Sequence, residues 1–313
     1  MIPVVDFSSS PERVAKELLD ACQQTGFVRI INHPLSESAL DEAFESAKRL
    51  FALPDDDKMK APHPKGWTIL RGYSWPGLEK VSQAMTTGDN EEARKQLREV
   101  PDVKEVYDIG SENNTSQPNQ WLPDETLPGF KDFITQFYWD RDQVGKEVLR
   151  ALAIGLNLEA DYLTRKHSGY DNQLRLSTSS HRCAAHTDWS SITLLFQDDC
   201  GGLEVEDISR PGTFVPAPPV KYSIIMNVGD LLQRWSNDRL RSTNHRVSLP
   251  ELSDRIEGPN RVTRERYSIP YFMSPDDDTI IECIPSCMSE EQPAKYEPIT
   301  RANYNKMRAS MMY

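Results

Sequence analysis

The chain of 313 residues is long enough for one large domain or two ordinary ones, and its 48 Asp and Glu residues outnumber its 36 Lys and Arg residues, for a net charge of −12. This acidity argues against nucleic acid or an anionic membrane surface as a partner. No apolar run approaches the roughly 20 residues of a membrane span, and the N-terminus has no basic or signal-like stretch. The predicted location is therefore the cytoplasm, while the oligomeric state is left open.

The cysteines indicate neither a disulfide framework nor a zinc site. They are five, an odd number, and only Cys283 and Cys287 are close in sequence, with no second pair to complete a zinc site. We therefore expect reduced, structural thiols.

The first 60 residues predict alternating strands and helices. In chain order we expect a strand over 2–7, a helix capped by Ser9 or Ser10, a strand over 27–31 and a helix started by Ser36 or Ser38. Pro11 suits the first turn of the first helix. Apolar residues recur at helical spacing after each cap, so both helices are expected to be amphipathic.

The middle of the chain divides into a loop-like stretch and a long helix. Residues 62–128 are rich in Pro, Gly, Asn and charge, a composition typical of loops. Within them, residues 71–76 are expected to form an ordered loop. Residues 130–156 carry the longest helical pattern of the chain, with apolar residues from Phe133 to Ile154.

The character changes to β from Gln173 onward. Strand-like runs are separated by polar turns, and they cover 192–196, 203–205, 222–228 and 267–272. Many short strands after a helical first half predict an α+β fold, a jelly roll (double-stranded β-helix) buttressed by N-terminal helices. The core is expected over about 173–285 and the helical and loop region over about 1–130. No flexible linker separates them, so residues 1–313 are predicted to form a single domain.

Two distant segments of this β-rich half predict a metal site. In His186-Thr187-Asp188, the two outer side chains share one face of a strand because alternate residues point the same way. His245 can supply a third ligand from another strand. Two imidazoles and a carboxylate suit iron and leave three positions open for co-substrate and oxygen. His33 and His63 instead precede prolines in expected loops, and His167 and His181 have no carboxylate at the right spacing.

A second pair of residues predicts an anion clamp. Arg266 and Ser268 are two apart on a predicted strand, so they share a face, and a guanidinium with a hydroxyl can bind one carboxylate. Arg261 and Thr263 repeat the spacing, and Arg264 adds a further alternative. Arg266 is preferred because the apolar run 269–272 follows it directly, as in an inner strand. With the metal site, this suggests an iron enzyme that binds a small dicarboxylate.

These motifs carry a family resemblance over almost the whole chain. It rests on the ordered stretches 2–7, 25–27, 32–33, 186–195, 201–205, 227–230, 242–247 and 266–268. The chain resembles the Fe(II)/2-oxoglutarate-dependent dioxygenases of the isopenicillin N synthase-like group. Within that group it is most similar to fungal thymine 7-hydroxylase, through the stretches 71–74, 171–176, 194–198, 229–238 and 266–272.

The resemblance implies an oxidoreductase of fungal secondary metabolism that uses Fe(II), 2-oxoglutarate and O2 to oxidise a C–H bond. His186, Asp188 and His245 would bind the metal, Arg266 and Ser268 would bind 2-oxoglutarate, and no catalytic residue beyond the metal centre is implied. The substrate would be a small, flat molecule such as a pyrimidine or a natural-product intermediate. Its expected pocket residues are Asn172, Arg175, Trp189 and Phe272.

Three functional hypotheses remain open from the sequence. The first is the 2-oxoglutarate-dependent dioxygenase. The second is an iron oxidase that does not use 2-oxoglutarate, because residues 177–180 read Ser-Thr-Ser-Ser where the family often has an Asn-x-Tyr feature. The third, a binding protein on an inactive scaffold, is disfavoured because no metal ligand is missing. Hydroxylation, repeated oxidation, desaturation and ring rearrangement are not distinguished.

Overall fold

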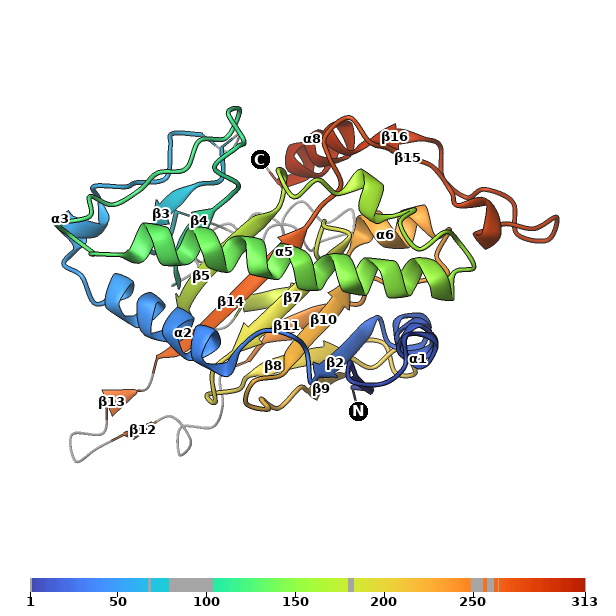
Figure 1. Cartoon of the computed structure of the whole chain (residues 1–313), viewed down its shortest axis with the longest axis horizontal. Coiled ribbons are helices and arrows are strands. Elements are labelled where there is room, and N and C mark those ends of the chain that lie inside the picture. The colour runs from blue at the N-terminus through green and yellow to red at the C-terminus, as the bar shows by residue number, and fades with distance from the viewer. Residues whose placement is uncertain are drawn as a thin grey trace.

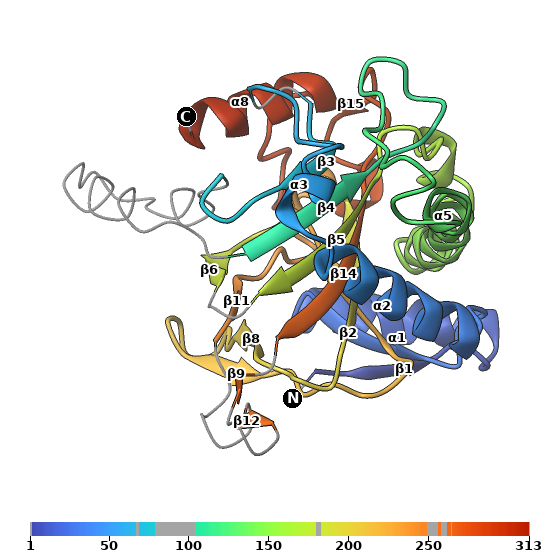
Figure 2. The ribbon, with the colours of Figure 1, turned by 90° about the vertical axis from the view of Figure 1, so that its left-hand side faces the viewer.

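A large and a small β-sheet form the centre of the protein, and helices cover the outer side of the large sheet (Figures 1 and 2). The computed structural model describes residues 2–66, 69–78, 104–179, 183–248, 256–257, 262–263 and 265–312. Together the two sheets form the predicted jelly roll. In Figure 2 the small sheet lies on one side of the large sheet and α1, α2 and α5 lie on the other.

The large sheet has eight strands. Their spatial order is β1 (Val4–Asp6), β2 (Phe27–Ile31), β10 (Ile224–Val228), β7 (Ile192–Gln197), β14 (Arg266–Met273), β5 (Gln173–Ser179), β4 (Lys104–Ile109) and β3 (Gly72–Ser74). All pairs are antiparallel except β1 with β2. The strands expected around residues 4, 28, 194, 226 and 270 are therefore confirmed.

The small sheet has four strands and carries two of the predicted metal ligands. Its order is β6 (Cys183–His186), β11 (His245–Val247), β8 (Leu203–Glu206) and β9 (Phe214–Pro216). Two short hairpins lie outside both sheets. They pair β12 (Ile256–Glu257) with β13 (Val262–Thr263), and β15 (Ile280–Ile281) with β16 (Ile299–Thr300).

The helices form where the caps and periodicity predict them. Ser10 caps α1 (Pro11–Gln24) and Ser36 caps α2 (Glu37–Phe51), each accepting a backbone N–H with its hydroxyl oxygen. The long helix is α5 (Phe130–Gly155), which crosses the front of Figure 1. The shorter helices are α3 (Asp55–Lys58), η2 (Thr164–Lys166), α6 (Asp230–Trp235), η3 (Pro285–Cys287) and α8 (Arg301–Met312).

The loop-like composition of residues 62–128 was misleading. The segment contains β3 and β4, which extend the large sheet beyond β5. The register pairs Gly72 with Asp108 and Asp108 with Arg175. Strand formation here depends on pairing with β5, a long-range contact that local composition does not report.

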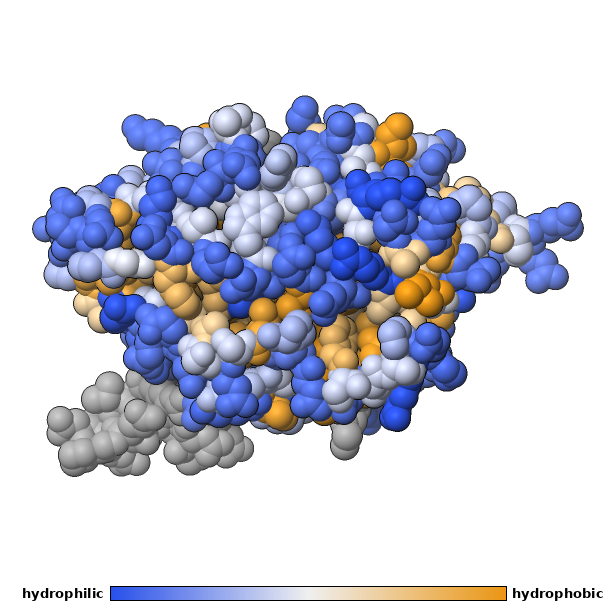
Figure 3. Space-filling model, viewed as in Figure 1, coloured by the Kyte–Doolittle hydropathy of each residue, from blue (hydrophilic) through white to orange (hydrophobic). Residues whose placement is uncertain are grey.

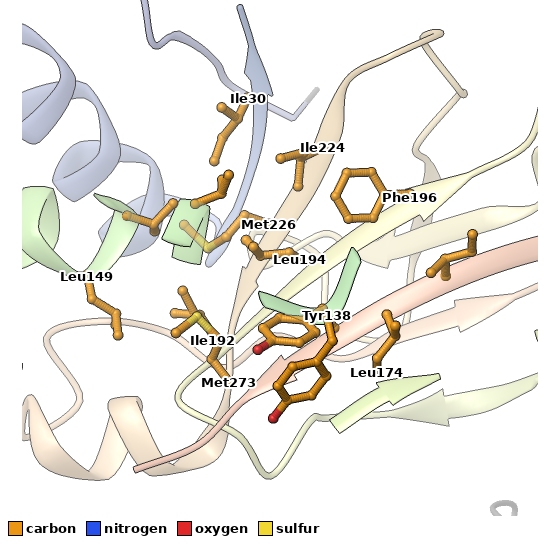
Figure 4. Close-up of a cluster of buried hydrophobic side chains, with 14 of the residues drawn as sticks. Ile30, Tyr138, Leu149, Leu174, Ile192, Leu194, Phe196, Ile224, Met226 and Met273 are labelled. Carbon is orange, nitrogen blue, oxygen red and sulfur yellow. The ribbon is translucent and has the colours of Figure 1, made fainter. Parts of the chain in front are cut away.

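The helix-facing side of the large sheet is the main hydrophobic core. Figure 4 shows side chains from strands and from α5 interlocking there, among them Ile30, Tyr138, Leu174, Phe196 and Met273. Seen from the helix side, the surface is mostly hydrophilic, and much of its remaining hydrophobic area lies between α5 and the helices α1 and α2 (Figure 3). The helices thus cover one face of the sheet and leave the other for the site.

Candidate active site

A cavity of about 370 Å³ is lined by the inner face of the large sheet and by the small sheet. The strands contribute alternate residues to it, as the pleat requires. From β14 these are Arg266, Ser268, Pro270 and Phe272, and from β5 they are Gln173, Arg175, Ser177 and Ser179. All three predicted metal ligands and both predicted clamp residues line this one cavity.

The metal ligands converge because β6 and β11 are neighbours. The register places His186 directly opposite His245, with ring centroids 4.3 Å apart. Asp188 follows β6 and points the same way as His186. Its Oδ1 is 3.8 Å from Nε2 of His186 and 3.7 Å from Nε2 of His245. One ligand atom from each residue lies within 4.8 Å of the others, and both Asp188 and His245 are buried.

Hydrogen bonds occupy the other polar atoms of these side chains and leave Asp188 Oδ1 and the two histidine Nε2 atoms available. Oδ2 of Asp188 accepts from Thr193 Oγ1 at 2.6 Å and from Asn227 Nδ2 at 2.7 Å, so Oδ1 remains for a cation. Nδ1 of His186 is 2.9 Å from the carbonyl oxygen of Ala184, and Nδ1 of His245 is 3.2 Å from that of Thr243. A carbonyl fixes the proton on Nδ1 and presents the Nε2 lone pair to a metal.

The electrostatics of the three groups also suit a divalent cation. Burial, together with His186, lowers the pKa of His245 to about 4, so this imidazole is neutral near pH 7. Burial opposes ionisation of Asp188, but the two histidines hold the pKa of its carboxyl below the ordinary value. Burial also lowers the pKa of His186, but Cys183 and Asp188 outweigh it and raise that pKa to about 9. A cation entering the site would therefore displace a proton from His186.

Asp230 connects the two ligand segments. Its backbone N–H donates to the carbonyl oxygen of Asp188 at 2.7 Å. Its carboxylate accepts from Thr187 at 3.1 Å and from Ser242 at 2.6 Å. The preceding Gly229 is required because a Cβ there would lie 2.0 Å from the carbonyl oxygen of Ser190. This turn fixes the Asp188 loop and the loop before His245 relative to each other.

The two residues of the predicted anion clamp share one face of β14. Arg266 and Ser268 are both buried on the cavity face of β14. Arg266 donates from Nε to the carbonyl oxygen of Gly201 at 2.7 Å and from Nη1 to Ser268 Oγ at 3.1 Å. Burial lowers the pKa of Arg266, yet an arginine remains charged at any physiological pH. The pair presents a fixed cationic surface inside the cavity.

Three of the four predicted pocket residues line the cavity, namely Arg175, Trp189 and Phe272. Arg175 is held by Asp108, with Nε–Oδ1 and Nη2–Oδ2 distances of 2.8 Å. The ring of Trp189 lies 5.4 Å from the Arg308 guanidinium of α8.

The pocket prediction for Asn172 is wrong. Its amide donates to Asp142 and to the Tyr271 hydroxyl, and it accepts from the backbone N–H of Ser274. The side chain is fully buried and does not line the cavity. Asn172 is two residues before Leu174 and shares its parity, so it belongs to the helix-facing side. Strand alternation in the sequence could have given this answer.

Several residues of the site were not singled out from the sequence. Thr193 and Asn227 orient Asp188, and both lie in stretches that carried the family resemblance, which was the available signal. Asp108 and Arg71 lie in the stretch interpreted as loop; Arg71 belongs to the stretch 71–74 that carried the family resemblance, whereas Asp108 had no such signal. Residues 180–182, which include the end of the Ser-Thr-Ser-Ser stretch 177–180, lie outside the described residues.

A jelly roll with two histidines and a carboxylate at one point of its interior defines the class of mononuclear non-haem metal oxygenases. Comparison with known proteins agrees. Residues 161–275 match the model of the 2OG-Fe(II) oxygenase superfamily, and residues 2–124 match the model described as non-haem dioxygenase in morphine synthesis N-terminal. The chain belongs to the 2-oxoglutarate- and Fe(II)-dependent oxygenases, and it is an oxidoreductase that uses Fe(II) and 2-oxoglutarate.

Several proteins similar to this chain are fungal. The chain is 36% identical to the 2-oxoglutarate-Fe(II) type oxidoreductase ppzD of Metarhizium rileyi, covering 97% of this chain and 87% of that protein. It is 37% identical to the proline hydroxylase buaE of Petromyces alliaceus, covering 96% and 94%. The structure of full-length thymine 7-hydroxylase from Neurospora crassa with alpha-KG and thymine superimposes with a TM-score of 0.84 at 35% identity, covering 100% and 97%.

These matches favour the first of the three functional hypotheses. The relatives are named for 2-oxoglutarate and Fe(II), which does not support the alternative of an oxidase without 2-oxoglutarate. No helix among the described residues is long and apolar enough to cross a membrane.

Proposed function

We propose that His186, Asp188 and His245 hold the Fe(II) of this enzyme and that Arg266 with Ser268 binds the distal carboxylate of 2-oxoglutarate. The observation that carries this proposal is the convergence of Asp188 Oδ1 and the two Nε2 atoms in the cavity that also contains the Arg266 guanidinium. Two imidazoles and a carboxylate fit Fe(II). The paired guanidinium and hydroxyl fit a carboxylate.

When bound, the iron would supply the activation of O2, which couples oxidation of 2-oxoglutarate to succinate and carbon dioxide with oxidation of a substrate C–H bond. The protein's own contribution is placement. Thr193 and Asn227 keep Asp188 Oδ1 turned toward the histidines. The carbonyls of Ala184 and Thr243 keep both Nε2 atoms available. The cavity that contains these residues would hold the reacting carbon of the substrate near the metal.

The substrate is proposed to be a small ring-containing molecule, such as a pyrimidine or a natural-product intermediate. The flat side chains of Trp189 and Phe272 suit stacking on a ring. Two relatives support a ring, since one is named a proline hydroxylase and another was crystallised with thymine. A volume of about 370 Å³ suits a molecule of this size together with 2-oxoglutarate.

The setting proposed for this activity is fungal secondary metabolism in the cytosol. Seven fungal relatives carry 2-oxoglutarate in their names. None of the five cysteines is in a disulfide, as expected in a reducing compartment. We also propose that residues 1–313 act as one domain, because α1, α2 and α5 contribute to the same buried cluster as the strands.

The test of the site is anaerobic titration of the Fe(II)-loaded protein with 2-oxoglutarate, followed by calorimetry. Arg266→Met is expected to weaken binding by about 10-fold or more, since a charge-assisted bidentate pair is lost. Arg165→Met, which removes an exposed arginine on η2, is the matched control. Wild-type protein that binds no 2-oxoglutarate, or Arg266→Met that binds it normally, would overturn the assignment. Succinate release with candidate substrates then measures turnover.

A further inference from the structure

The cavity has a second cationic end, distinct from the Arg266 clamp. Arg71 lines the cavity just before β3 and is only 2% exposed. Gly72 pairs with Asp108, so Arg71 lies near the Asp108 end of β4. The other end of β4 begins at Lys104, which pairs with Ser179, and Ser179 pairs in turn with Arg266. Four residue steps along the strand separate Lys104 from Asp108, about 13 Å at roughly 3.3 Å per residue.

The Arg71 guanidinium has no carboxylate partner among the described residues. Nη1 donates to the carbonyl oxygen of its neighbour Leu70 at 2.6 Å, and Nε is buried without any acceptor. The nearby carboxylate of Asp108 is already occupied. Its Oδ1 accepts from Gln173 and Arg175, and its Oδ2 accepts from Arg175. A buried charge left without a partner is costly, so this position indicates a ligand that supplies one.

The Gly110 backbone lies close to the Arg71 guanidinium. A Cβ added at Gly110 would lie 2.1 to 2.4 Å from Nη2, Cζ and Nε of Arg71, so a larger residue here would displace the guanidinium. Nη2 donates no hydrogen bond to any part of the chain that the structure describes, and unlike Nε it is not enclosed by the protein. Nη2 is therefore the nitrogen of Arg71 that can donate to a carboxylate in the cavity.

The charge of the cavity wall also favours an anionic ligand. Its described cationic side chains are Arg71, Lys104, Arg175, Arg266 and Arg301, against the carboxylates of Asp171 and Asp188. In a protein of net charge −12 this is a local excess of positive charge. Arg301, the neighbouring arginine from α8, is paired with Asp277, which leaves Arg71 as the described cation that lacks a partner carboxylate at this end.

We propose that Arg71 binds a carboxylate of the substrate, so that the enzyme oxidises a ring-containing carboxylic acid anchored opposite the 2-oxoglutarate clamp. This rests on the proposed function and deepens it. Arg266 would bind the co-substrate and Arg71 would bind the substrate. The three metal ligands line the same cavity. A neutral analogue would leave the Arg71 charge unpaired and would be rejected.

The experiment measures equilibrium binding to protein loaded with Fe(II) and 2-oxoglutarate under nitrogen. The probes are pyrrole-2-carboxylate, nicotinate, orotate and L-proline, each compared with its primary amide by calorimetry. At least one acid is expected to bind about tenfold or more tightly than its amide. Arg71→Met is expected to remove that preference by weakening the acid while leaving the amide within about twofold.

Three further variants separate the role of Arg71 from general damage. Gly110→Ala keeps the arginine but displaces its guanidinium, so it is expected to reproduce the loss. Arg71→Lys keeps the charge without the planar guanidinium and is expected to retain part of the preference. Arg301→Met removes a cation that already has a partner, and is expected to change the preference less than Arg71→Met.

The outcomes distinguish this inference from the proposed function. If 2-oxoglutarate binds normally but none of the four acids binds better than its amide, the Arg71 assignment is overturned and the proposed function stands. The same holds if the preference survives in Arg71→Met. If wild-type protein fails to bind 2-oxoglutarate, the proposed function falls, and the substrate assignment falls with it.

Discussion

The two faces of the large sheet carry opposite chemistry on the same strands. On β14, Tyr267, Ile269, Tyr271 and Met273 turn toward the helices, while Arg266, Ser268, Pro270 and Phe272 turn toward the cavity. On β5, Leu174 and Leu176 are fully buried under α2 and α5, and their neighbours Arg175 and Ser177 line the cavity. Because side chains alternate, one residue step decides whether a substitution affects stability or the site.

The helix-facing side is apolar and closely packed, so it is expected to supply most of the folding free energy. The cavity side collects charged and polar groups that a core would exclude, so it is expected to contribute little stability and to determine binding. Some polar residues are nevertheless buried on the packed side, among them Arg141 of α5. The predictions below test the two faces separately.

The largest effect is expected on the cavity side, at the metal. Asp188→Asn removes the only carboxylate among the three converging ligands while keeping its shape, so iron content and succinate formation are expected to fall to background. Metal analysis and a succinate assay check this. The circular dichroism spectrum is expected to remain that of the wild type, because Asp188 lines the cavity and is not part of the hydrophobic core. Retained iron together with retained turnover would contradict the ligand assignment.

The next effect is expected on the packed side of β5. Leu174 is fully buried, so Leu174→Ala is expected to lower the free energy of unfolding by about 2–5 kcal/mol through lost contacts and a cavity. Ser177→Ala, three residues away on the cavity face, is the matched control and is expected to stay within about 0.5 kcal/mol. Urea unfolding of metal-free protein measures both. Equal losses in the two variants would show that the faces do not differ in this way.

The smallest effect is expected at Arg141. Its three guanidinium nitrogens are buried without hydrogen-bond partners, and burial lowers its pKa to about 9. The guanidinium carbon lies 3.3 Å from the centre of the Phe137 ring, and the nearest described carboxylate oxygen, on Asp140, is 3.8 Å from Nη2. Replacing such a group by an apolar side chain removes its desolvation penalty, so Arg141→Met is expected to stabilise by about 1 kcal/mol or more. Thermal unfolding measures this, and a lower melting temperature would show that the stacking on Phe137 matters more.

Much of the site could be predicted from sequence because its signals are local. The spacings of His186 to Asp188 and of Arg266 to Ser268 place each pair on one strand face, whatever the rest of the chain does. The caps at Ser10 and Ser36 likewise act within one turn of helix. Short-range geometry of this kind is encoded in neighbouring residues, and the structure agrees with it.

The partners of these groups were decided only by the tertiary structure. The pairing of β6 with β11 brings His245 opposite His186 across almost 60 residues of chain. The addition of β4 beside β5 gives Arg175 its carboxylate, Asp108, and leaves Arg71 without one. Local sequence specifies which groups are present and which way they face along a strand. Long-range strand pairing decides which charges are neutralised by the protein, and therefore which one remains for a ligand.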